Sequence, residues 1–328
     1  MYPMRDVLTG QYGYWSGTAW SIAPQFAAAY PFSGGRALVK SDSLLGYGFV
    51  NHVGKTAWLE DIVGYKVDAN GFYDYFGNPC SVAACREQSG TVWLLNQQLR
   101  AKVVECRELR DAQDVSVVGS VLLARWQKPS GADTYGFVDF DGRRLFSERE
   151  IEGVRPSLDG FWGVKEQGSW SFLDVGSGAT IAKPFVDLAP FNSGLGAVLI
   201  DGLWYVIDDR LQVQFESHFD RIDMFSNGYA VAYNAEHCGY LATNGNFSTF
   251  TEYAELGSVN RHGIGVGNRD TCEWTLDLIK PNGVKILGSY SAVDFTDGDF
   301  PQFELWKGDV LELYSPASGP IALPPHLK

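Results

Sequence analysis

The sequence predicts an all-β protein built from about nine copies of a unit of roughly 35 residues. Three observations lead to this fold class. Aromatic residues make up 14% of the 328 residues, and there are 37 glycines, a composition typical of β-strands separated by tight turns. A hydrophobic strand position also recurs at a nearly fixed spacing. Long runs with helical periodicity are scarce, so a helical repeat is not expected.

The recurring position supplies a register for the repeat. From Phe137 to Tyr240 the successive positions lie 35, 34 and 34 residues apart. The full set of positions is Tyr14, Phe49, Leu94, Phe137, Phe172, Val206, Tyr240, Leu276 and Glu312. A fixed period of this kind is typical of arrays in which each unit buries its hydrophobic face on its neighbour.

Each copy reads as a hairpin with one or two further elements. Apolar residues alternate on both sides of a polar turn in the segment 231–243, and Asn244-Gly245 and Asn282-Gly283 mark chain reversals. Units of two or three strands predict an open, curved or superhelical stack of hairpin sheets. The alternative is a closed β-propeller-like array, which usually needs four strands per blade.

The copies resemble the bacterial WG-repeat (KWG-repeat) family. The first strand region matches at Phe32, Ser33, Gly35, Ala37 and Val39, and again at Phe225, Ser226, Gly228, Ala230 and Val231. The second strand matches at Tyr135, Gly136, Phe137, Val138, Asp139 and Gly142. The resemblance extends in diverged form over most of the chain, with the Trp-Gly pair mostly replaced. It implies a β-repeat binding scaffold without a catalytic motif, and some family members look like immunity proteins of bacterial toxins.

We expect residues 1–328 to form a single array with longer, irregular units at about 56–134. Within them, Trp126–Thr134 reads as an extended hairpin loop. The segment Asn96–Val115 is either a short helix or a strand followed by a turn.

Charge and composition restrict the possible partners and compartment. The net charge of −13 and pI of about 4.8 disfavour nucleic-acid binding and favour a basic protein partner. No stretch approaches 18 apolar residues and the N-terminus does not resemble a secretory signal, so no membrane association is expected. Five cysteines at irregular spacing are typical of a reducing compartment, and we expect the cytoplasm.

No catalytic, cofactor or metal motif is recognisable. Gly54-Lys55-Thr56 resembles the end of a phosphate-binding loop, but Phe49 stands where its first glycine should be. The five histidines lack metal-ligand spacing, and Cys80, Cys85 and Cys106 lack a convincing fourth ligand. The sequence therefore predicts a protein that is not an enzyme and binds no cofactor or metal.

Breaks in the repeat are the candidate binding sites, because insertions in repeat proteins form loops. One break is an aromatic cluster, and tyrosine and phenylalanine are typical interface anchors, although these rings could equally pack in the core. The other is an acidic segment near the C-terminus. The candidate partner-binding residues are Phe72, Tyr73, Asp74, Tyr75, Phe76, Asp294, Asp297, Asp299 and Glu304.

The leading hypothesis is a protein-binding scaffold, and within it an immunity-type inhibitor that occludes the active site of a bacterial toxin. Acidic loops and aromatic anchors would dock onto a basic cleft. A carbohydrate-binding module is the alternative, because 10 Trp and 16 Tyr could stack on sugar rings. Hydrolysis by a pair of carboxylates in a central pocket is a third hypothesis.

Overall fold

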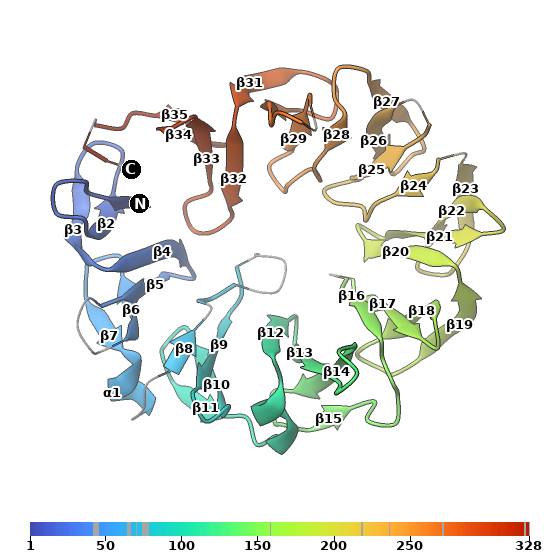
Figure 1. The fold of residues 1–328 in the computed structure, drawn as a ribbon, viewed down its shortest axis with the longest axis horizontal. Helices are drawn as coiled ribbons and strands as arrows, with labels where there is room; N and C mark the ends of the chain where they lie inside the picture. Colours follow the sequence, from blue (N-terminus) through green and yellow to red (C-terminus); the bar gives the residue numbers. More distant parts are fainter. Residues whose placement is uncertain are drawn as a thin grey trace. The chain divides into compact units, whose positions relative to one another are not determined.

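A computed structural model describes residues 1–328 except 42–45, 64–66, 70, 74–78, 158, 218, 236, 271, 325 and 328. The described residues form nine antiparallel sheets, in which neighbouring strands follow one another in sequence (Figure 1). Eight sheets have four strands and the first has three. Four-stranded sheets of this simple order are the blades of β-propellers. The fold is thus of the propeller-like type that was the alternative, and the nine units are confirmed.

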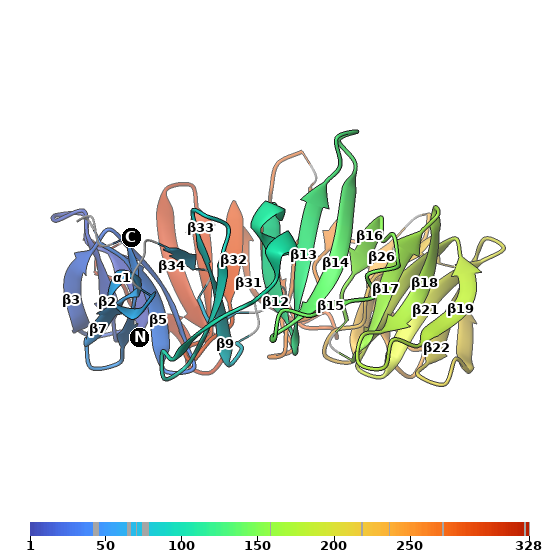
Figure 2. The ribbon, with the colours of Figure 1, turned by 90° about the horizontal axis from the view of Figure 1, so that it is seen from below.

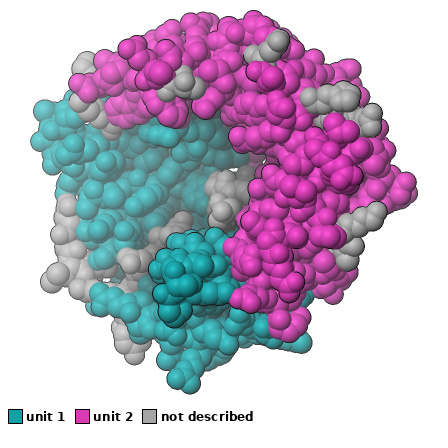
Figure 3. All heavy atoms as spheres, turned by 45° about the vertical axis from the view of Figure 1, so that its right-hand side comes forward, with its two compact units in different colours: residues 1–147, 294–305, 311–328 teal, residues 148–293, 306–310 magenta. Residues whose placement is uncertain are grey.

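The chain divides into two compact units, which Figure 3 colours separately. Unit 1 contains residues 1–147, 294–305 and 311–328, and unit 2 contains residues 148–293 and 306–310. We number the sheets 1 to 9 along the chain. Unit 1 holds sheets 1 to 4 and most of sheet 9, and unit 2 holds sheets 5 to 8.

The strands of unit 1 follow one another in regular order within each sheet. Sheet 1 has β1 (Tyr2–Arg5), β2 (Tyr12–Trp15) and β3 (Trp20–Phe26). Sheet 2 has β4 (Ala28–Ser33), β5 (Arg36–Lys40), β6 (Tyr47–Asn51) and β7 (Thr56–Trp58), followed by α1 (Leu59–Val63). Sheet 3 has β8 (Val67–Ala69), β9 (Val82–Glu87), β10 (Val92–Asn96) and β11 (Ala101–Val103), followed by the 3₁₀ helix η1 (Arg107–Asp111). Sheet 4 has β12 (Asp114–Val118), β13 (Val121–Gln127), β14 (Asp133–Asp139) and β15 (Arg144–Leu145). Sheet 9 has β32 (Ala292–Thr296), β33 (Gln302–Lys307), β34 (Val310–Ser315) and β35 (Gly319–Ile321).

The elements of unit 2 follow the same pattern. Sheet 5 has β16 (Gly153–Arg155), β17 (Phe161–Glu166), β18 (Ser169–Asp174) and β19 (Thr180–Phe185). Sheet 6 has β20 (Asp187–Asn192), β21 (Leu195–Ile200), β22 (Leu203–Asp208) and β23 (Val213–Ser217). Sheet 7 has β24 (Arg221–Ile222), β25 (Tyr229–Tyr233), β26 (Cys238–Ala242) and β27 (Phe247–Phe250). Sheet 8 has β28 (Glu255–Leu256), β29 (Gly265–Asn268), β30 (Leu276–Ile279) and β31 (Lys285–Tyr290).

The expectation of two or three strands per unit was too low. The first strand of sheet 7 has only two residues, Arg221–Ile222, and the fourth strand of sheet 4 also has two, Arg144–Leu145. Segments this short have no alternation that a pattern could detect, yet they pair with their neighbours over two positions. The segment 96–115 contains both predicted alternatives, since the strand β11 precedes the helix η1.

The hydrophobic core lies between successive sheets of each unit. Because side chains alternate across a strand, the two faces of a sheet serve two different cores. In sheet 2, Val39 and Val50 pack toward sheet 1, while Leu38 and Phe49 pack toward sheet 3. The predicted register positions from Tyr14 to Leu276 are all buried, which explains the strength of the repeat signal.

The serine of the Phe-Ser-x-Gly pattern links neighbouring sheets. The Ser33 hydroxyl donates a hydrogen bond to the Phe72 carbonyl at 2.7 Å, and the Ser226 hydroxyl donates one to the Val259 carbonyl at 2.7 Å. Both acceptors lie ahead of the second strand of the following sheet. The motif is therefore explained by contacts between copies.

The strands of each four-stranded sheet end on two opposite sides, where the chain turns, and we call these two sides edges. One, which we name the connector edge, carries the turn between the second and third strands and the connection into the first strand. The opposite edge carries the other two turns. In sheet 4, the long β13–β14 hairpin and the helix η1 lie at this connector edge (Figure 2).

Candidate functional site

The predicted aromatic cluster is only partly accessible. Phe72 is fully buried between sheets 2 and 3, with its ring centroid 5.0 Å from that of Phe49. Tyr73 is half-buried. The predicted residues Asp74, Tyr75 and Phe76 lie outside the described residues.

The predicted acidic residues form two groups in sheet 9. Asp294 on β32 is exposed, and Glu304 on the adjacent strand β33 is half-buried. Burial, and secondly the charge of Asp294, raises the pKa of Glu304. Asp297 and Asp299 lie instead in the turn that joins β32 to β33.

This turn reaches from sheet 9 to sheet 2, and we name residues 297–301 the clasp. The carboxylate of Asp299 accepts hydrogen bonds from the N–H groups of Gly34 at 2.9 Å and Gly35 at 2.8 Å. Its own N–H donates to the Phe32 carbonyl at 2.8 Å. Both glycines have positive φ, so the β4–β5 turn presents two successive N–H groups to one carboxylate.

Tyr73 joins the clasp from sheet 3. Its hydroxyl donates to the same Phe32 carbonyl at 3.3 Å, and burial, followed by the charges of Asp299 and Asp297, raises its pKa. His52 lies 3.5 Å from the Asp299 carboxylate through Nε2. The structure therefore brings Tyr73, from the predicted aromatic cluster, close to Asp297 and Asp299, from the predicted acidic segment. The carboxylate of Asp299 is used for hydrogen bonds within the protein.

A longer hairpin in sheet 8 is the feature that sequence reasoning missed. The Gly283 N–H donates to the Lys280 carbonyl, just as the Gly245 N–H donates to the Ala242 carbonyl in sheet 7. Leu278 precedes Lys280 by two residues, just as Tyr240 precedes Ala242. Leu278, and not the predicted Leu276, is therefore the residue of sheet 8 that is equivalent to Tyr240. The extra residues lie in the loop of the β29–β30 hairpin. The last pair before this loop is Asn268 with Leu276, whereas the corresponding pair in sheet 7, Tyr233 with Cys238, encloses a shorter loop.

The longer hairpin presents Trp274, whose side chain is 63% exposed. It is the only one of the ten tryptophans, all of which are described, that is classed as exposed. The loop is held in place at its base. The Asn268 side-chain oxygen accepts the N–H groups of Asp270 and Thr275, both at 3.3 Å, and the Arg269 N–H donates to the Thr275 carbonyl at 3.0 Å.

A buried carboxylate supports the same loop from beneath. The side chain of Asp277 is 0% exposed and accepts hydrogen bonds from Arg269 Nε at 2.8 Å, the Tyr253 hydroxyl at 3.0 Å and the Ser289 N–H at 2.8 Å. Desolvation acts to raise the pKa of Asp277, but these hydrogen bonds outweigh it and hold the pKa below its ordinary value. Arg269 begins the Trp274 loop, so this network fixes its starting point.

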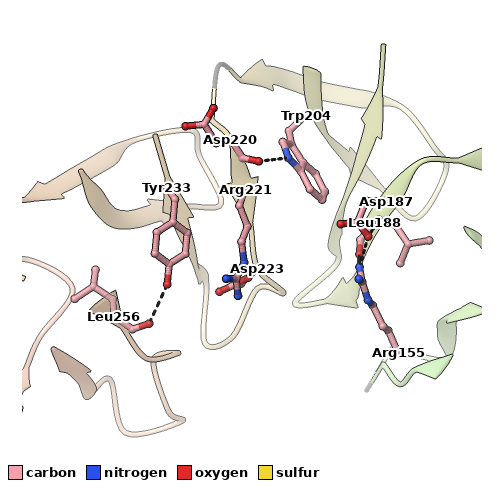
Figure 4. Close-up of polar contacts among 9 residues, drawn as sticks. All are labelled: Arg155, Asp187, Leu188, Trp204, Asp220, Arg221, Asp223, Tyr233 and Leu256. Atoms are coloured by element: carbon pink, nitrogen blue, oxygen red, sulfur yellow. Dashed lines mark hydrogen bonds and ion pairs between the residues drawn. The ribbon is translucent and has the colours of Figure 1, made fainter. Parts of the chain in front are cut away.

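Charged and aromatic residues continue along the connector edge of unit 2 (Figure 4). Arg155 donates to the carboxylate of Asp187 at 2.6 Å, and its guanidinium lies 4.3 Å from the ring centroid of Trp170. Arg221 donates to Asp223 at 2.7 Å and lies 5.1 Å from the ring centroid of Tyr233. Guanidinium–aromatic contacts of this kind are electrostatically attractive.

Exposed apolar residues lie at the same edge of the sheets of unit 2. Val186 is 72% exposed and precedes β20 of sheet 6. Val310 is 60% exposed and begins β34, in the short part of sheet 9 (residues 306–310) that belongs to unit 2. Ile200 lies at the end of β21, before the turn to β22. Together with Trp274 they give this edge several large apolar side chains beside its charged groups. Single exposed apolar residues are ordinary, but a tryptophan on a supported loop among them is typical of a binding surface.

Comparisons with known proteins support the fold more than the function. The WG containing repeat matches residues 19–44, so the family resemblance is confirmed for one repeat and not for most of the chain. No curated protein matches the sequence. A crystal structure described as the eukaryotic initiation factor is similar with a TM-score of 0.59 at 11% identity, covering 88% of this chain and 81% of that one.

Two further solved structures align more loosely. BamB from Moraxella catarrhalis gives a TM-score of 0.43 at 12% identity over 88% of this chain and 93% of its own. The Cps50 (Swd1) β-propeller domain of Myceliophteria thermophila gives a TM-score of 0.39 at 10% identity over 76% of this chain and 96% of its own. At such low identities, similarity shows the fold alone.

Two kinds of feature are absent from the part of the chain that the structure describes. No group of three or more His, Cys, Asp or Glu side chains in this part is arranged to hold a metal ion. None of the helices in it is both long and apolar enough to pass through a lipid bilayer.

Proposed function

We propose that the protein is a non-enzymatic protein-binding scaffold whose partner docks on the connector edge of unit 2. The observation that carries this proposal is Trp274, which is exposed in the loop of a hairpin that is longer than its counterpart in sheet 7. Tryptophan is the residue most enriched in binding hot spots, and a loop fixed by a buried network loses little entropy when a partner covers it.

The charge of unit 2 favours a basic partner. Its residues include 20 acidic and 11 basic side chains, a formal net charge of −9 out of −13 for the whole chain. A field of one sign accelerates the approach of an oppositely charged partner. Exposed Asp270 and Glu273 precede Trp274 in the same loop, so charge and apolar contact would act on the same part of the partner.

Within this role we propose an immunity-type inhibitor that neutralises a bacterial toxin by occluding a basic active-site cleft. The support is the resemblance of the repeat to the WG family, which matches at residues 19–44, combined with the acidic surface of unit 2. In this mechanism Trp274 enters the cleft and the surrounding carboxylates pair with the catalytic or substrate-binding cations of the toxin.

A comparison of Trp274→Ala with Val213→Ala tests the proposal. Val213 is 57% exposed in the same unit but begins the fourth strand of sheet 6, at the opposite edge, so its variant is a matched control. A partner is captured with the wild-type protein from lysate of the organism that makes it, identified by mass spectrometry and purified. We expect Trp274→Ala to weaken its binding by at least about 30-fold, as for a hot-spot residue, and Val213→Ala to leave the affinity within about twofold.

Two results would contradict the proposal. If both variants bind the purified partner like the wild type, the docking surface lies elsewhere. If the captured partner keeps its full enzymatic activity when saturated with the protein, the inhibitory role is wrong even where binding is real.

A carbohydrate-binding role has weaker support. Of the ten tryptophans only Trp274 is exposed, so the described surface offers no row of tryptophan rings for a glycan chain. Binding on a glycan array that disappears in Trp274→Ala would favour this alternative over a protein partner.

A further inference from the structure

A turn of the same two-residue form lies between the first and second strands of sheets 2, 6 and 7. The turn residues are 34–35 in sheet 2, 193–194 in sheet 6 and 227–228 in sheet 7, each enclosed by a pair of bridged residues. Both residues of every one of these turns have positive φ, between 50° and 82°. Successive N–H groups in such a turn can form a concave binding site for an anion.

The turns of sheets 2 and 6 each hold a carboxylate from elsewhere in the chain. In sheet 2 the N–H groups of Gly34 and Gly35 donate to Asp299 at 2.9 and 2.8 Å. In sheet 6 the Gly194 N–H donates to the carboxylate of Asp159 at 2.8 Å. Asp159 lies just before the second strand of sheet 5, so this acid comes from the preceding sheet. Binding a carboxylate is therefore a repeated property of this turn.

The turn of sheet 7 has the same backbone but receives no acid from the preceding sheet. Ser193 stands 35 residues before Gly228, just as Asp159 stands 35 residues before Gly194. Serine has no carboxylate to offer. Among the residues that the structure describes, none accepts a hydrogen bond from the N–H of Asn227 or Gly228. These two N–H groups remain available to a ligand.

The sheet 7 turn is both accessible and fixed. Asn227 is exposed, and a Cβ added at Gly228 would meet no other described residue within 4 Å. Ser226 and Tyr229 exchange two main-chain hydrogen bonds, at 2.7 and 3.1 Å, across the turn. The Ser226 hydroxyl also donates to the Val259 carbonyl of sheet 8. The two N–H groups are thus held in position before any ligand binds.

We propose that the Asn227–Gly228 turn binds the carboxylate group of a ligand, as the equivalent turns hold Asp299 and Asp159. Hydrogen bonds from N–H groups to a carboxylate are stronger than those to a neutral acceptor. Small organic acids and acidic side chains of peptides both present this group, and the probes below separate the two sources. The turn lies at the edge opposite the connector edge, so the site does not depend on the function proposed for Trp274.

An NMR titration of the full-length protein, labelled with ¹⁵N-glycine, tests the proposal. The probes are sodium acetate, a small acid, and N-acetyl-aspartate N-methylamide, a peptide-like source of the same group. Acetamide and sodium chloride are the controls for a neutral acceptor and for ionic strength. The Gly228 signal is identified by its loss in Gly228→Asn, since asparagine tolerates positive φ.

We expect a saturable shift of the Gly228 amide signal with at least one of the two carboxylate probes, and the probe that binds more tightly identifies the source. The signals of Gly35 and Gly194 should stay in place, because their N–H groups are already bonded to carboxylates. The proposal is overturned if neither carboxylate probe shifts the Gly228 signal at about 100 mM, which corresponds to a binding free energy near zero on the scale of real sites. An equal shift with sodium chloride overturns it as well.

Three variants exchange the states of the turns. Ser193→Asp supplies a carboxylate at the position equivalent to Asp159, and we expect it to weaken acetate binding at Gly228 at least about tenfold. Ser193→Gly suits the positive φ without adding a charge, so it is the matched control and should bind acetate like the wild type. Asp159→Ala removes the acceptor of the Gly194 N–H, so acetate should now shift the Gly194 signal. If Ser193→Asp binds acetate as well as Ser193→Gly while both keep the wild-type melting temperature, the carboxylate site is not in this turn.

Discussion

Asp277 stands at a position that glycine occupies in four other copies, those of sheets 1, 2, 4 and 7. In sheets 2 and 4 the residue before the buried register position is Gly48 or Gly136, and a Cβ at these sites would lie 2.6 Å from Trp58 or 2.9 Å from Trp126. Glycine fits at these two positions because the tryptophan ring of a neighbouring strand lies over the third strand. Sheet 8 accommodates Asp277 because the opposing strand β31 has a shifted register and supplies Gly288 beside the carboxylate.

The lowered pKa of Asp277 predicts a pH-dependent contribution to stability. A carboxylate whose folded pKa lies below the unfolded value of 3.8 stabilises the protein fully above that value, and the contribution disappears as pH falls through the folded pKa. We therefore expect the difference in unfolding free energy between wild type and Asp277→Asn to be largest at pH 5 to 7 and to shrink below about pH 3.8. Urea denaturation at a series of pH values measures it.

Asp270→Asn is the control for this effect, because Asp270 is an exposed carboxylate on the same hairpin. Its stability difference from wild type should be small at neutral pH. A difference for Asp277→Asn that stays constant from pH 7 to pH 3 would show that the carboxylate charge contributes nothing beyond the shape of the side chain.

At the level of elements, the clasp takes over a contact that a complete sheet 1 would make. Sheet 1 has three strands and lacks the first strand of the other copies, since β2 with Tyr14 occupies the third position. The extended β32–β33 turn instead contacts sheet 2 through Asp299, and Phe300 lies against Tyr2 of sheet 1 with a centroid distance of 6.4 Å. An acidic break in the repeat therefore serves to join sheets.

Asp299→Asn tests the strength of this junction. The variant weakens the two hydrogen bonds from Gly34 and Gly35 by removing the charge of the acceptor, and we expect a loss of about 1–2 kcal/mol in the free energy of unfolding. Asp294→Asn, which changes an exposed carboxylate of the same sheet, should change stability by less than about 0.5 kcal/mol. Equal effects of the two variants in chemical denaturation would mean that the clasp bonds add no stability.

The sequence allowed the repeat to be predicted because its signal is local. The position held by Phe49 in one copy and by Phe137 in another is buried in every regular copy. Because a buried position requires a hydrophobic side chain, such a residue recurs at a constant interval. The error at Leu276 arose because this residue is also apolar and buried, so its hydrophobicity concealed the two-residue difference from Leu278.

The candidate sites were less predictable because they depend on contacts between distant residues. Nothing near Asp299 in sequence indicates that its acceptor atoms are used by Gly34 and Gly35, or that Tyr73 shares the same carbonyl. A pocket of about 370 Å³ between sheets 3 and 4 likewise requires Gly90 to meet Arg110, which is 20 residues away in sequence. The length of the β29–β30 hairpin was the one local signal that could have indicated Trp274.

At the scale of the whole molecule, the two ends of the chain meet in unit 1. The Val7 N–H donates to the His326 carbonyl at 3.1 Å, and Asp6 pairs with Leu327 as in an antiparallel bridge (Figure 1). Leu327 is buried with Met4, Trp15 and Leu313 in the core between sheets 1 and 9. The C-terminal residues thus occupy part of the edge of β1 that a first strand would cover.

Leu327→Ala tests this connection. Loss of a buried leucine side chain typically costs about 2–5 kcal/mol, and at a chain end we expect the lower part of that range. Hydrogen exchange followed by mass spectrometry should show faster exchange in sheets 1 and 9 of the variant, with sheets 5 to 8 unchanged. Leu323→Ala is not a suitable control because Leu323 packs against the same cluster, whereas Val53→Ala is suitable because Val53 is 85% exposed in sheet 2. Equal exchange in the Leu327→Ala and Val53→Ala variants would contradict the connection.

The discontinuity of unit 1 has a consequence for synthesis. Residues 148–293 are nearly the whole of unit 2 and are contiguous, so their sheets can form while the remainder of the chain is still on the ribosome. Unit 1 begins earlier but also contains residues 294–305 and 311–328, which are translated after residues 148–293. One edge of β1 therefore stays unpaired until translation has supplied Leu327.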